Sequence, residues 1–328
     1  MKLNTKVLLT EPINEKATKI LEDAVEKVIV APDRAVDAVA SVLDDKVEGI
    51  IIRFSVFNRQ LFDKAPNLKV IVRHGIGVEL IDVDAATDHG VMVVNTPTAA
   101  TVSVAEHVLM MVLVLSKKLF IADHAIRKGN YAIKESYGPD DAEGKTLGLV
   151  GFGRIAREAG RRCLALGMKV ITYDPYLKPE AVAGSGATMV DSLERVLAEA
   201  DFVSMHTPLT PTTRHLISDK QFATMKPTAY FINCSRGEVV DEAALVRALQ
   251  AKTIAGAGLD VFEAEPPATN NPLFAMENVV VTPHSAALTA NGKFKMATHS
   301  VDQLLKVLRG EKPDSLMNPK VLEKLKKK

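Results

Sequence analysis

Short runs rich in Val, Ile and Leu alternate with segments of helical pattern along most of the chain, and this alternation limits the possible folds more than any other feature. Strands separated by helical segments of about 10 or more residues are typical of βαβ units and of a parallel sheet. The runs are continuously apolar, as expected of strands that are covered on both faces. The sequence therefore predicts an α/β protein.

The predicted strands form two series, which suits a chain of 328 residues, because one domain usually has about 100–200 residues. The first series is Val7–Thr10, Val28–Val30, Gly49–Arg53, Val70–His74 and Val91–Asn95. The second series is Thr146–Val150, Lys169–Asp174, Phe202–His206, Ala229–Asn233, Ile254–Asp260 and Val279–Thr282. Between them, the apolar segment Thr101–Lys128 contains no proline, and we expect two helices that cross between the domains.

A glycine-rich turn, Gly151-Phe152-Gly153-Arg154-Ile155-Ala156, follows the first strand of the second series and precedes a helical pattern. In such a unit the first glycine permits the tight turn, and the second lets the backbone approach a pyrophosphate. The diphosphate would meet the free N–H groups of the helix N-terminus. We interpret the segment as a dinucleotide site; the alternative is a structural turn.

Asp174 ends the next predicted strand, 21 residues after Gly153. An acidic residue about 20 residues downstream of the glycines accepts hydrogen bonds from the ribose hydroxyls. A carboxylate there also repels a 2′-phosphate, and Pro175-Tyr176-Leu177 supplies no arginine to receive one. We therefore predict NAD rather than NADP, with a simple turn residue as the alternative role of Asp174.

The later strand ends offer the groups that hydride transfer to a keto acid requires besides the cofactor: a cation, a proton donor and a partner for that donor. Arg236 suits carboxylate binding because its planar fork makes two parallel hydrogen bonds. His284 suits the proton transfer, and a carboxylate beside it would favour the charged ring. Spacing alone leaves Glu263 and Glu265 as alternatives for that carboxylate, and leaves a structural His284 open.

The other histidines and cysteines receive weaker assignments. His74 precedes Gly75-Ile76-Gly77 and is a candidate for substrate contact, whereas His206 is expected to line the cofactor site without taking part in the chemistry. Cys234 is expected to be a small structural residue rather than a reactive thiol. No Cys/His cluster has metal-ligand spacing, so we predict no metal.

Composition excludes several classes of partner. With 41 Lys and Arg against 40 Asp and Glu, the chain lacks the basic excess of nucleic-acid-binding proteins. Its longest apolar run, Val108–Leu115, is far shorter than the ~20 residues that span a membrane, and the N-terminus lacks the apolar region of a signal peptide. Two cysteines cannot form a disulfide framework, and we expect a cytoplasmic protein.

Taken together, these segments resemble the D-isomer-specific 2-hydroxyacid dehydrogenases. The motifs that carry the resemblance stand in the family's order: Val72–Val78, Ser103–His107, Gly144–Gly148, Gly151–Ala156, His206–Thr210, Met225–Gly237, Asp260–Phe262, Glu265-Pro266 and Pro283-His284. The resemblance implies two doubly wound parallel-sheet domains. A Rossmann NAD-binding domain, residues 101–288, would be inserted in a flavodoxin-like substrate domain, residues 1–100 and 289–328. It also implies a homodimer built around the crossover helices.

The resemblance implies roles for individual residues. Arg236 would bind and polarise a small 2-keto acid, His284 would be the general acid/base, and Glu265 would be its partner. Residues expected to contact the cofactor are Gly151, Gly153, Arg154, Ile155, Asp174, His206, Thr207, Pro208, Cys234 and Asp260. Residues expected to contact the substrate are Arg53, His74, Gly75, Ile76 and Gly77.

Arg53 is placed like an arginine that meets the distal phosphate in phosphoglycerate dehydrogenases, and its alternative is an exposed strand-end residue. A functional Arg53 favours substrates such as 3-phosphoglycerate, glycerate/hydroxypyruvate or a related sulfonate. The chain departs from the family at Glu79-Leu80, where Asp-Asn is frequent, and at Ala156 and Ala286, where glycine is frequent. The alternative functions are an NAD(H)-sensing interaction protein resembling the related co-repressors, and a formate dehydrogenase.

Overall fold

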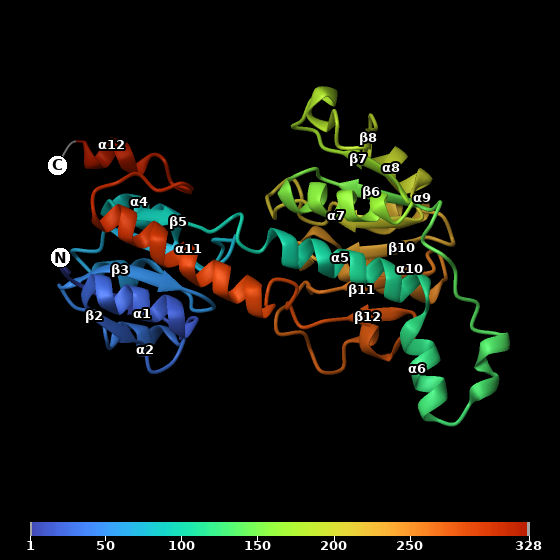
Figure 1. Ribbon diagram of the computed structural model, residues 1–328, viewed down its shortest axis with the longest axis horizontal. Helices are drawn as coiled ribbons and strands as arrows, with labels where there is room; N and C mark the ends of the chain where they lie inside the picture. The colour runs from blue at the N-terminus through green and yellow to red at the C-terminus, as the bar shows by residue number, and fades with distance from the viewer. Residues whose placement is uncertain (1, 327–328) are drawn as a thin grey trace. The chain divides into compact units, whose positions relative to one another are not determined.

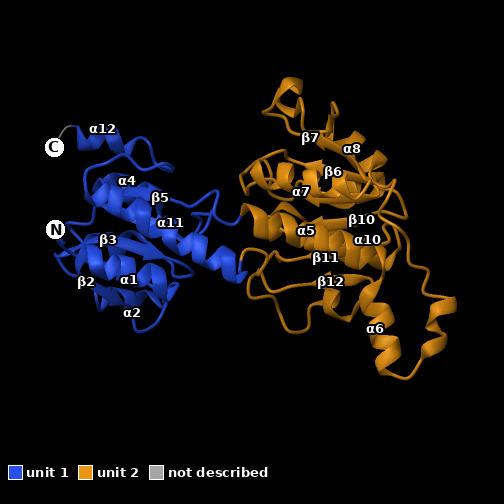
Figure 2. Cartoon of the chain, viewed as in Figure 1, with its two compact units in different colours: residues 1–100, 288–328 blue, residues 101–287 orange. Residues whose placement is uncertain are grey.

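The computed structural model describes residues 2–326, and the chain forms α/β architecture with two parallel sheets (Figure 1). It divides into two compact units: residues 1–100 with 288–328 form unit 1, and residues 101–287 form unit 2 (Figure 2). The predicted fold class is confirmed. No helix within residues 2–326 is both long enough and apolar enough to cross a membrane.

Unit 1 contains a five-stranded sheet with the order β2-β1-β3-β4-β5, which is the flavodoxin-like arrangement. Its strands are β1 Leu3–Leu9, β2 Val25–Val30, β3 Val47–Ile52, β4 Val70–Arg73 and β5 Met92–Val94. One face is covered by α1 (Glu15–Ala24) and α11 (Ala290–Leu308). The other is covered by α2 (Val36–Ala40), α3 (Arg59–Asp63) and α4 (Val83–His89). The short α12 (Val321–Leu325) lies near the end of the chain.

Unit 2 contains a seven-stranded sheet with the order β12-β11-β10-β9-β6-β7-β8. Its strands are β6 Thr146–Val150, β7 Lys169–Tyr173, β8 Thr188–Met189, β9 Phe202–Met205, β10 Tyr230–Asn233, β11 Gly256–Leu259 and β12 Val279–Val281. The chain reverses its direction of travel across the sheet between β6 and β9. In open α/β sheets, ligands bind in the crevice at the carboxyl edge beside such a reversal.

Helices cover both faces of the unit 2 sheet. The helices on one face are α5 (Thr101–Ser116) and α7 (Arg154–Ala165). Those on the other are α8 (Leu193–Glu199), α9 (Asp219–Thr224) and α10 (Glu242–Gln250). The remaining helices are α6 (Leu119–Arg127) and the 3₁₀ turns η1 (Tyr131–Glu135), η2 (Pro179–Val182), η3 (Gly237–Val239) and η4 (Pro272–Ala275).

Eight predicted strands end one residue earlier in the structure. Each of their last predicted residues lies just after the end of the observed strand: Thr10, Arg53, His74, Asn95, Asp174, His206, Asp260 and Thr282. These polar side chains therefore belong to the loops at the carboxyl edges of the sheets. The two-residue strand β8 was not predicted, because it is too short to produce a recognisable apolar run. The apolar segment 101–128 forms two helices as expected, and Lys118, with a φ of 49°, lies at the break between them.

Candidate active site

The residues expected to carry the chemistry follow β10, β11 and β12, three neighbouring strands of unit 2. The loop after β10 carries Arg236, the loop after β11 carries Asp260 and Glu265, and the loop after β12 carries His284. Since these strands are parallel, their carboxyl ends meet at one edge of the sheet. The structure thus brings the predicted arginine, glutamate and histidine to adjacent loops.

His284 is paired with Glu265. The Nδ1 atom of His284 lies 2.6 Å from Glu265 Oε2, and the other carboxylate oxygen accepts the N–H of Phe262 at 3.1 Å. Glu263 instead contacts His215, so the structure distinguishes the two glutamates that spacing could not. His284 has a φ of 50°, an uncommon conformation for a residue other than glycine. Such backbone strain is concentrated at functional sites.

The pKa of Glu265 is set by opposing effects. Burial alone would raise it, but the hydrogen bond and charge of His284, the N–H of Phe262 and the charge of Arg236 together hold the pKa below its ordinary value. The carboxyl group is therefore ionised near neutral pH. An ionised partner at this distance stabilises a positively charged imidazole ring.

Asp260 holds the loop that carries His284. Its side chain is almost fully buried, and it accepts hydrogen bonds from Thr282 Oγ1 (2.6 Å), Ser285 N (2.8 Å) and Ala286 N (2.9 Å). The backbone carbonyl of Asp260 also accepts the N–H of His284 at 2.7 Å. Ala286 is buried and its N–H makes one of these bonds, so the structure accommodates alanine at this position.

Arg236 lies in a loop that is held from two sides. The side chain of Asn233 accepts from Ser235 N (3.0 Å) and donates to the carbonyl of Arg236 (2.8 Å). On the other side, a Cβ atom added to Gly237 would lie 1.8 Å from the carbonyl oxygen of Phe262. Only glycine can occupy that position, and the Arg236 loop therefore lies directly against the loop of Glu265.

The glycine-rich turn has the geometry of a dinucleotide site. Gly151 has a φ of +92°, and a Cβ there would lie 3.0 Å from the carbonyl oxygen of His206. Gly153 immediately precedes α7, and a Cβ there would meet no heavy atom within 4 Å. This open space in front of a helix N-terminus fits a pyrophosphate. Arg154 and Ile155 begin α7, and Ala156, the next residue of this helix, is fully buried.

Asp174 has a structural role, whereas its contact with a ribose stays a prediction. Its Oδ2 accepts the N–H of Phe152 and its Oδ1 accepts the N–H of Tyr176, both at 3.0 Å. The carboxylate therefore braces the glycine-rich turn from the end of the neighbouring strand. Each carboxylate oxygen has a second lone pair, so these bonds leave acceptor capacity for ribose hydroxyls.

The next residues that we expect to contact the cofactor follow β9 and β10. Burial lowers the pKa of His206 to about 4, so its ring is neutral near pH 7, and its Nε2 lies 3.0 Å from Ser204 Oγ. Thr207 Oγ1 is buried without a hydrogen-bond partner among residues 2–326, as expected of a group that meets a polar ligand. Pro208 continues this loop. Burial raises the pKa of the Cys234 thiol, which agrees with a structural rather than a reactive residue.

The predicted substrate loop of unit 1 follows β4. Gly75 has a φ of 144°, and its N–H donates to the carbonyl of Arg73 and to Thr96 Oγ1. The Arg73 side chain donates to the carbonyls of Gly77 (2.9 Å) and His74 (2.7 Å) and so closes the loop. None of the hydrogen bonds described for residues 2–326 uses the N–H of Ile76 or Gly77. Two amides of this loop thus suit an anionic ligand.

Arg53 and His74 lie close to each other in unit 1. Burial, followed by the charge of Arg53, lowers the pKa of His74 to about 4, so the ring is neutral near pH 7. The guanidinium of Arg53 donates to the carbonyl of Pro12 at 2.6 Å and lies 5.1 Å from the centre of the Phe54 ring. Its Nε atom is buried and has no partner within residues 2–326.

The part of the chain that the structure describes contains one cluster of histidine and carboxylate side chains compact enough for a metal ion: His299, Asp302 and Asp314. The ammonium group of Lys306 lies 3.2 Å from Asp302 and 3.0 Å from Asp314. This ammonium group already pairs with both carboxylates, so the cluster gives no reason to infer a metal.

Sequence reasoning missed the residues that support the site. Asn233 and Thr282 lie within recognised strand ends, and a search for polar residues at those positions could have found them. Arg73 stands inside a recognised motif, but nothing in the local sequence shows that its side chain bonds back to the same loop. His215 has no local signal, because its partner Glu263 lies 48 positions away.

Comparisons with known proteins agree with this architecture. Residues 109–286 match the family described as D-isomer specific 2-hydroxyacid dehydrogenase, NAD binding domain. The chain is 40% identical over 95% of its length to the D-3-phosphoglycerate dehydrogenase of Methanocaldococcus jannaschii, and spans 59% of that protein. It is 38% identical over 98% of its length to the glyoxylate reductase of Thermococcus litoralis, and spans 98% of that protein.

A solved structure gives the same result. The NAD-complexed D-isomer specific 2-hydroxyacid dehydrogenase of Lactobacillus delbrueckii ssp. bulgaricus superimposes with a TM-score of 0.82 at 28% identity, covering 95% of this chain and 100% of that one. The fold and the glycine-rich turn thus define a dinucleotide-binding protein of the Rossmann class. The chain belongs to the D-isomer-specific 2-hydroxyacid dehydrogenase family, and the predicted cofactor, NAD, is confirmed.

Proposed function

We propose that this protein is an NAD-dependent dehydrogenase that interconverts a small D-2-hydroxy acid and its 2-keto acid. The observation that carries the proposal is the His284–Glu265 pair, which joins the loops after β11 and β12 beside the Arg236 loop, at the carboxyl edge of the unit 2 sheet. When bound, the nicotinamide supplies or accepts the hydride. The chain must then bind the acid and move one proton.

His284 moves the proton in this proposal. Its Nδ1 faces the carboxylate of Glu265, which leaves Nε2 to donate a proton to the carbonyl oxygen during reduction and to take it back during oxidation. Glu265 stabilises the charged ring and fixes its orientation. Arg236 binds the carboxylate of the substrate through its planar fork and polarises the neighbouring carbonyl group.

The loop residues of unit 1 are proposed to select the substrate. The amides around Ile76 and Gly77 would bind the substrate carboxylate. His74, whose ring is neutral, would contact the substrate without adding a charge. Arg53 would meet a second anionic or polar end, since its buried Nε lacks a partner within residues 2–326. This favours phosphohydroxypyruvate, hydroxypyruvate or a related sulfonate over a keto acid without such an end.

A substrate panel tests the proposal. NADH oxidation at 340 nm would be measured with glyoxylate, pyruvate, hydroxypyruvate and phosphohydroxypyruvate. Turnover of at least one of them is expected, and no turnover with any 2-keto acid would refute the proposed activity.

The variant Arg53→Ala tests the second part of the proposal. For a substrate with a distal anion we expect kcat/KM to fall by about 10–100-fold, the usual cost of losing a hydrogen bond to a charged group. For glyoxylate, which has no distal group, kcat/KM should change little, so glyoxylate serves as the internal control. Equal effects on both substrates would contradict a role for Arg53 in selectivity.

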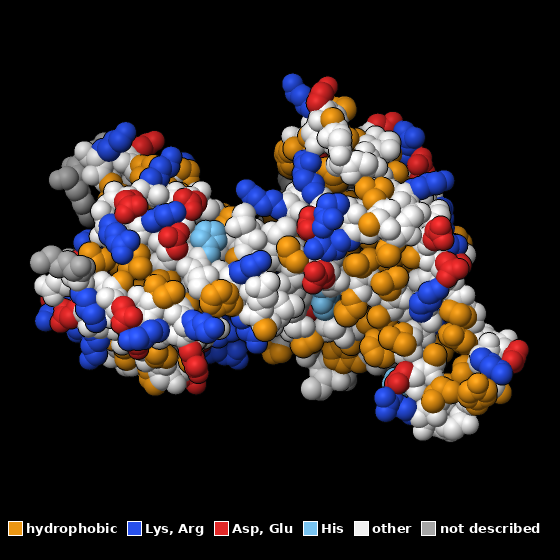
Figure 3. Space-filling model, viewed as in Figure 1, with side chains coloured by type: hydrophobic (Ala, Val, Ile, Leu, Met, Phe, Trp, Pro, Cys, Tyr) orange, Lys and Arg blue, Asp and Glu red, His pale blue; other side chains and the backbone are white. Residues whose placement is uncertain are grey.

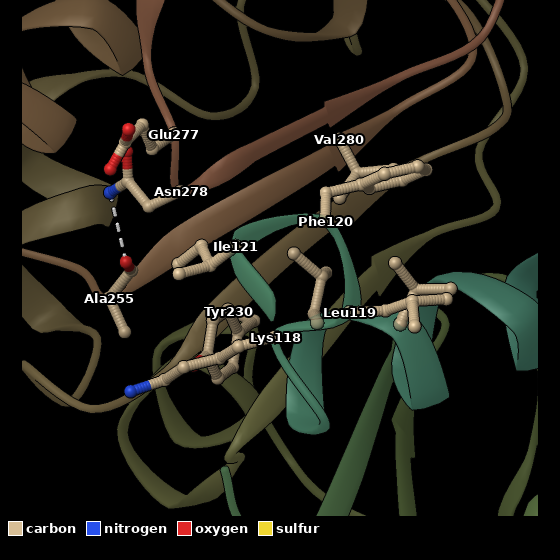
Figure 4. Close-up of a pocket in the computed structure, with 11 residues that line it drawn as sticks. Lys118, Leu119, Phe120, Ile121, Tyr230, Ala255, Glu277, Asn278 and Val280 are labelled. Carbon is tan, nitrogen blue, oxygen red and sulfur yellow. Dashed lines mark hydrogen bonds between the residues drawn. The ribbon is translucent and has the colours of Figure 1, made fainter. Parts of the chain in front are cut away.

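We also propose that two copies of the chain associate through α5 and α6, and that the protein resides in the cytoplasm. Apolar side chains gather over these helices (Figure 3), including Leu119 and Phe120, which are 50% and 46% exposed. They border an apolar pocket lined also by Tyr230 of β10 and Val280 of β12 (Figure 4). Such a patch marks an association surface, and a second copy presents the same apolar face. The two cysteines are unpaired, as a reducing compartment would keep them.

The double variant Leu119→Asp/Phe120→Asp is expected to convert the dimer into a monomer, because two carboxylates would be buried in an apolar contact. Sedimentation equilibrium measures the mass directly. The matched control is Ile20→Asp on α1, an equally exposed apolar residue of unit 1, which should leave the mass unchanged. A dimer that survives the double variant would place the association surface elsewhere.

A further inference from the structure

A second histidine–glutamate pair lies beside the first. His215, in the loop between β9 and α9, has its Nε2 atom 2.6 Å from Glu263 Oε1. Glu263 stands two positions before Glu265 in the loop after β11. None of the roles proposed above uses this pair, although it reaches the loop that holds the partner of His284.

Glu263 is part of a closed set of hydrogen bonds. Its Oε2 accepts the N–H of Glu242 at 3.1 Å, and Glu242 Oε2 accepts the N–H of Glu263 at 3.0 Å. Asn271 Nδ2 donates to the remaining oxygen of Glu242 at 2.7 Å. Two carboxylates therefore lie near each other at the start of α10, and the ring of His215 supplies the donor that faces Glu263.

The backbone of His215 contacts the loop of Arg236 as well. Its N–H donates to the carbonyl of Glu238 at 2.9 Å, two positions beyond Arg236. His215 has a φ of 50°, which is uncommon for a residue other than glycine. A residue held in this way is kept there by its surroundings. His215 thus bonds to both loops that carry the proposed reacting groups.

The path from His215 to His284 is short. Glu263 follows Phe262, whose N–H donates to Glu265 Oε1 at 3.1 Å, and Glu265 Oε2 contacts His284 Nδ1. The carbonyl of the same Phe262 lies against Gly237. A shift of the Glu263 peptide would therefore move the carboxylate of Glu265 relative to the ring of His284.

We propose that His215 is a positioning residue for the reaction: through Glu263 it fixes the loop that presents Glu265 to His284. The inference rests on the proposed dehydrogenase function. Displacement of a reacting group by about 1 Å can cost about 10²-fold in rate, so a residue that does not touch the substrate can still set kcat.

The test is a kinetic comparison of wild type with His215→Leu and His215→Gln. The leucine removes the donor, and we expect kcat to fall by about 10-fold or more while KM for NADH and Tm change little. The glutamine retains an N–H donor and should restore most of kcat. The matched control is His89→Leu in unit 1, since His89 Nε2 also pairs with a carboxylate, Asp63, at 2.9 Å; its kcat should equal that of wild type.

Other outcomes overturn the inference. A lower Tm with unchanged kcat would show that His215 is merely structural, and a higher KM for NADH with unchanged kcat would assign it to the cofactor loop. The ¹⁵N resonances of the His284 ring provide a readout that does not need turnover. These resonances should shift in His215→Leu and not in His89→Leu. Unchanged resonances in His215→Leu would contradict the positioning role of His215. A wild-type protein that reduced no 2-keto acid would refute only the proposed activity.

Discussion

Replacement of His284 with alanine is expected to lower kcat for 2-keto acid reduction by about 10²–10⁴-fold, the usual contribution of a positioned proton donor. Binding of NADH should change little, because the glycine-rich turn and Asp174 lie on other strands of the sheet. The enhancement of NADH fluorescence on binding measures the dissociation constant. The chain has no tryptophan to complicate that signal.

Two further variants separate the loss of the ring from other effects. His284 has a φ of 50°, and asparagine tolerates this conformation better than alanine. His284→Asn should therefore be as inactive as His284→Ala while retaining the backbone geometry. Glu265→Gln retains a hydrogen-bond acceptor but removes the negative charge, and we expect an intermediate loss of kcat. If His284→Asn kept activity within tenfold of wild type, another group would have to supply the proton.

The second large effect is expected for Arg236→Lys. Lysine keeps the positive charge but replaces a rigid fork with a single ammonium group, so at least one charge-assisted hydrogen bond to the substrate carboxylate is lost. A loss of about 1.5–3 kcal/mol corresponds to a fall in kcat/KM of about 10–100-fold. Initial rates of NADH oxidation over a range of substrate concentrations measure it.

Because Arg236→Lys keeps the positive charge, comparison with Arg236→Gln separates the effect of the charge from that of the planar fork. The charge of Arg236 helps to hold the pKa of Glu265 below its ordinary value, so Arg236→Gln should let that pKa rise, whereas Arg236→Lys should not. The matched control is Arg247→Lys, since Arg247 makes two hydrogen bonds to Asp219 on the surface of unit 2 at 3.0 and 2.6 Å. Its kcat/KM should not change. A fully active Arg236→Lys would mean that the substrate carboxylate is bound elsewhere.

The sequence predicted those parts of the fold and site that depend on short segments. Continuous apolar runs located the strands because each is buried on both faces. Gly151 marked the glycine-rich turn because its φ of +92° and its close approach to His206 disfavour a side chain there, and Gly153 marked the open space before α7. The proposed reacting residues were found because each one closely follows a predicted strand. Asp174 shows the limit of predictions from short segments. Its hydrogen bond with the N–H of Phe152 joins the ends of two strands, and the sequence pattern of neither strand indicates it.

The remaining features depend on which loops become neighbours. Glu263 and Glu265 lie in the same loop and carry the same carboxylate group. Only the fold shows that Glu263 faces His215 and that Glu265 faces His284. Asp260 was expected near the cofactor. The structure shows that its side chain accepts hydrogen bonds from the loop that carries His284. Its partners lie 22 to 26 positions away, beyond the reach of periodicity arguments.

The absence of space for a side chain at Gly237 has an energetic consequence. Arg236, Glu265 and His284 belong to one compact unit, and the loops of the first two are interlocked where Gly237 meets Phe262. These two loops are therefore held together before a ligand binds, which lowers the ordering cost of binding. A larger residue at this position would separate them, and binding would then have to restore the contact.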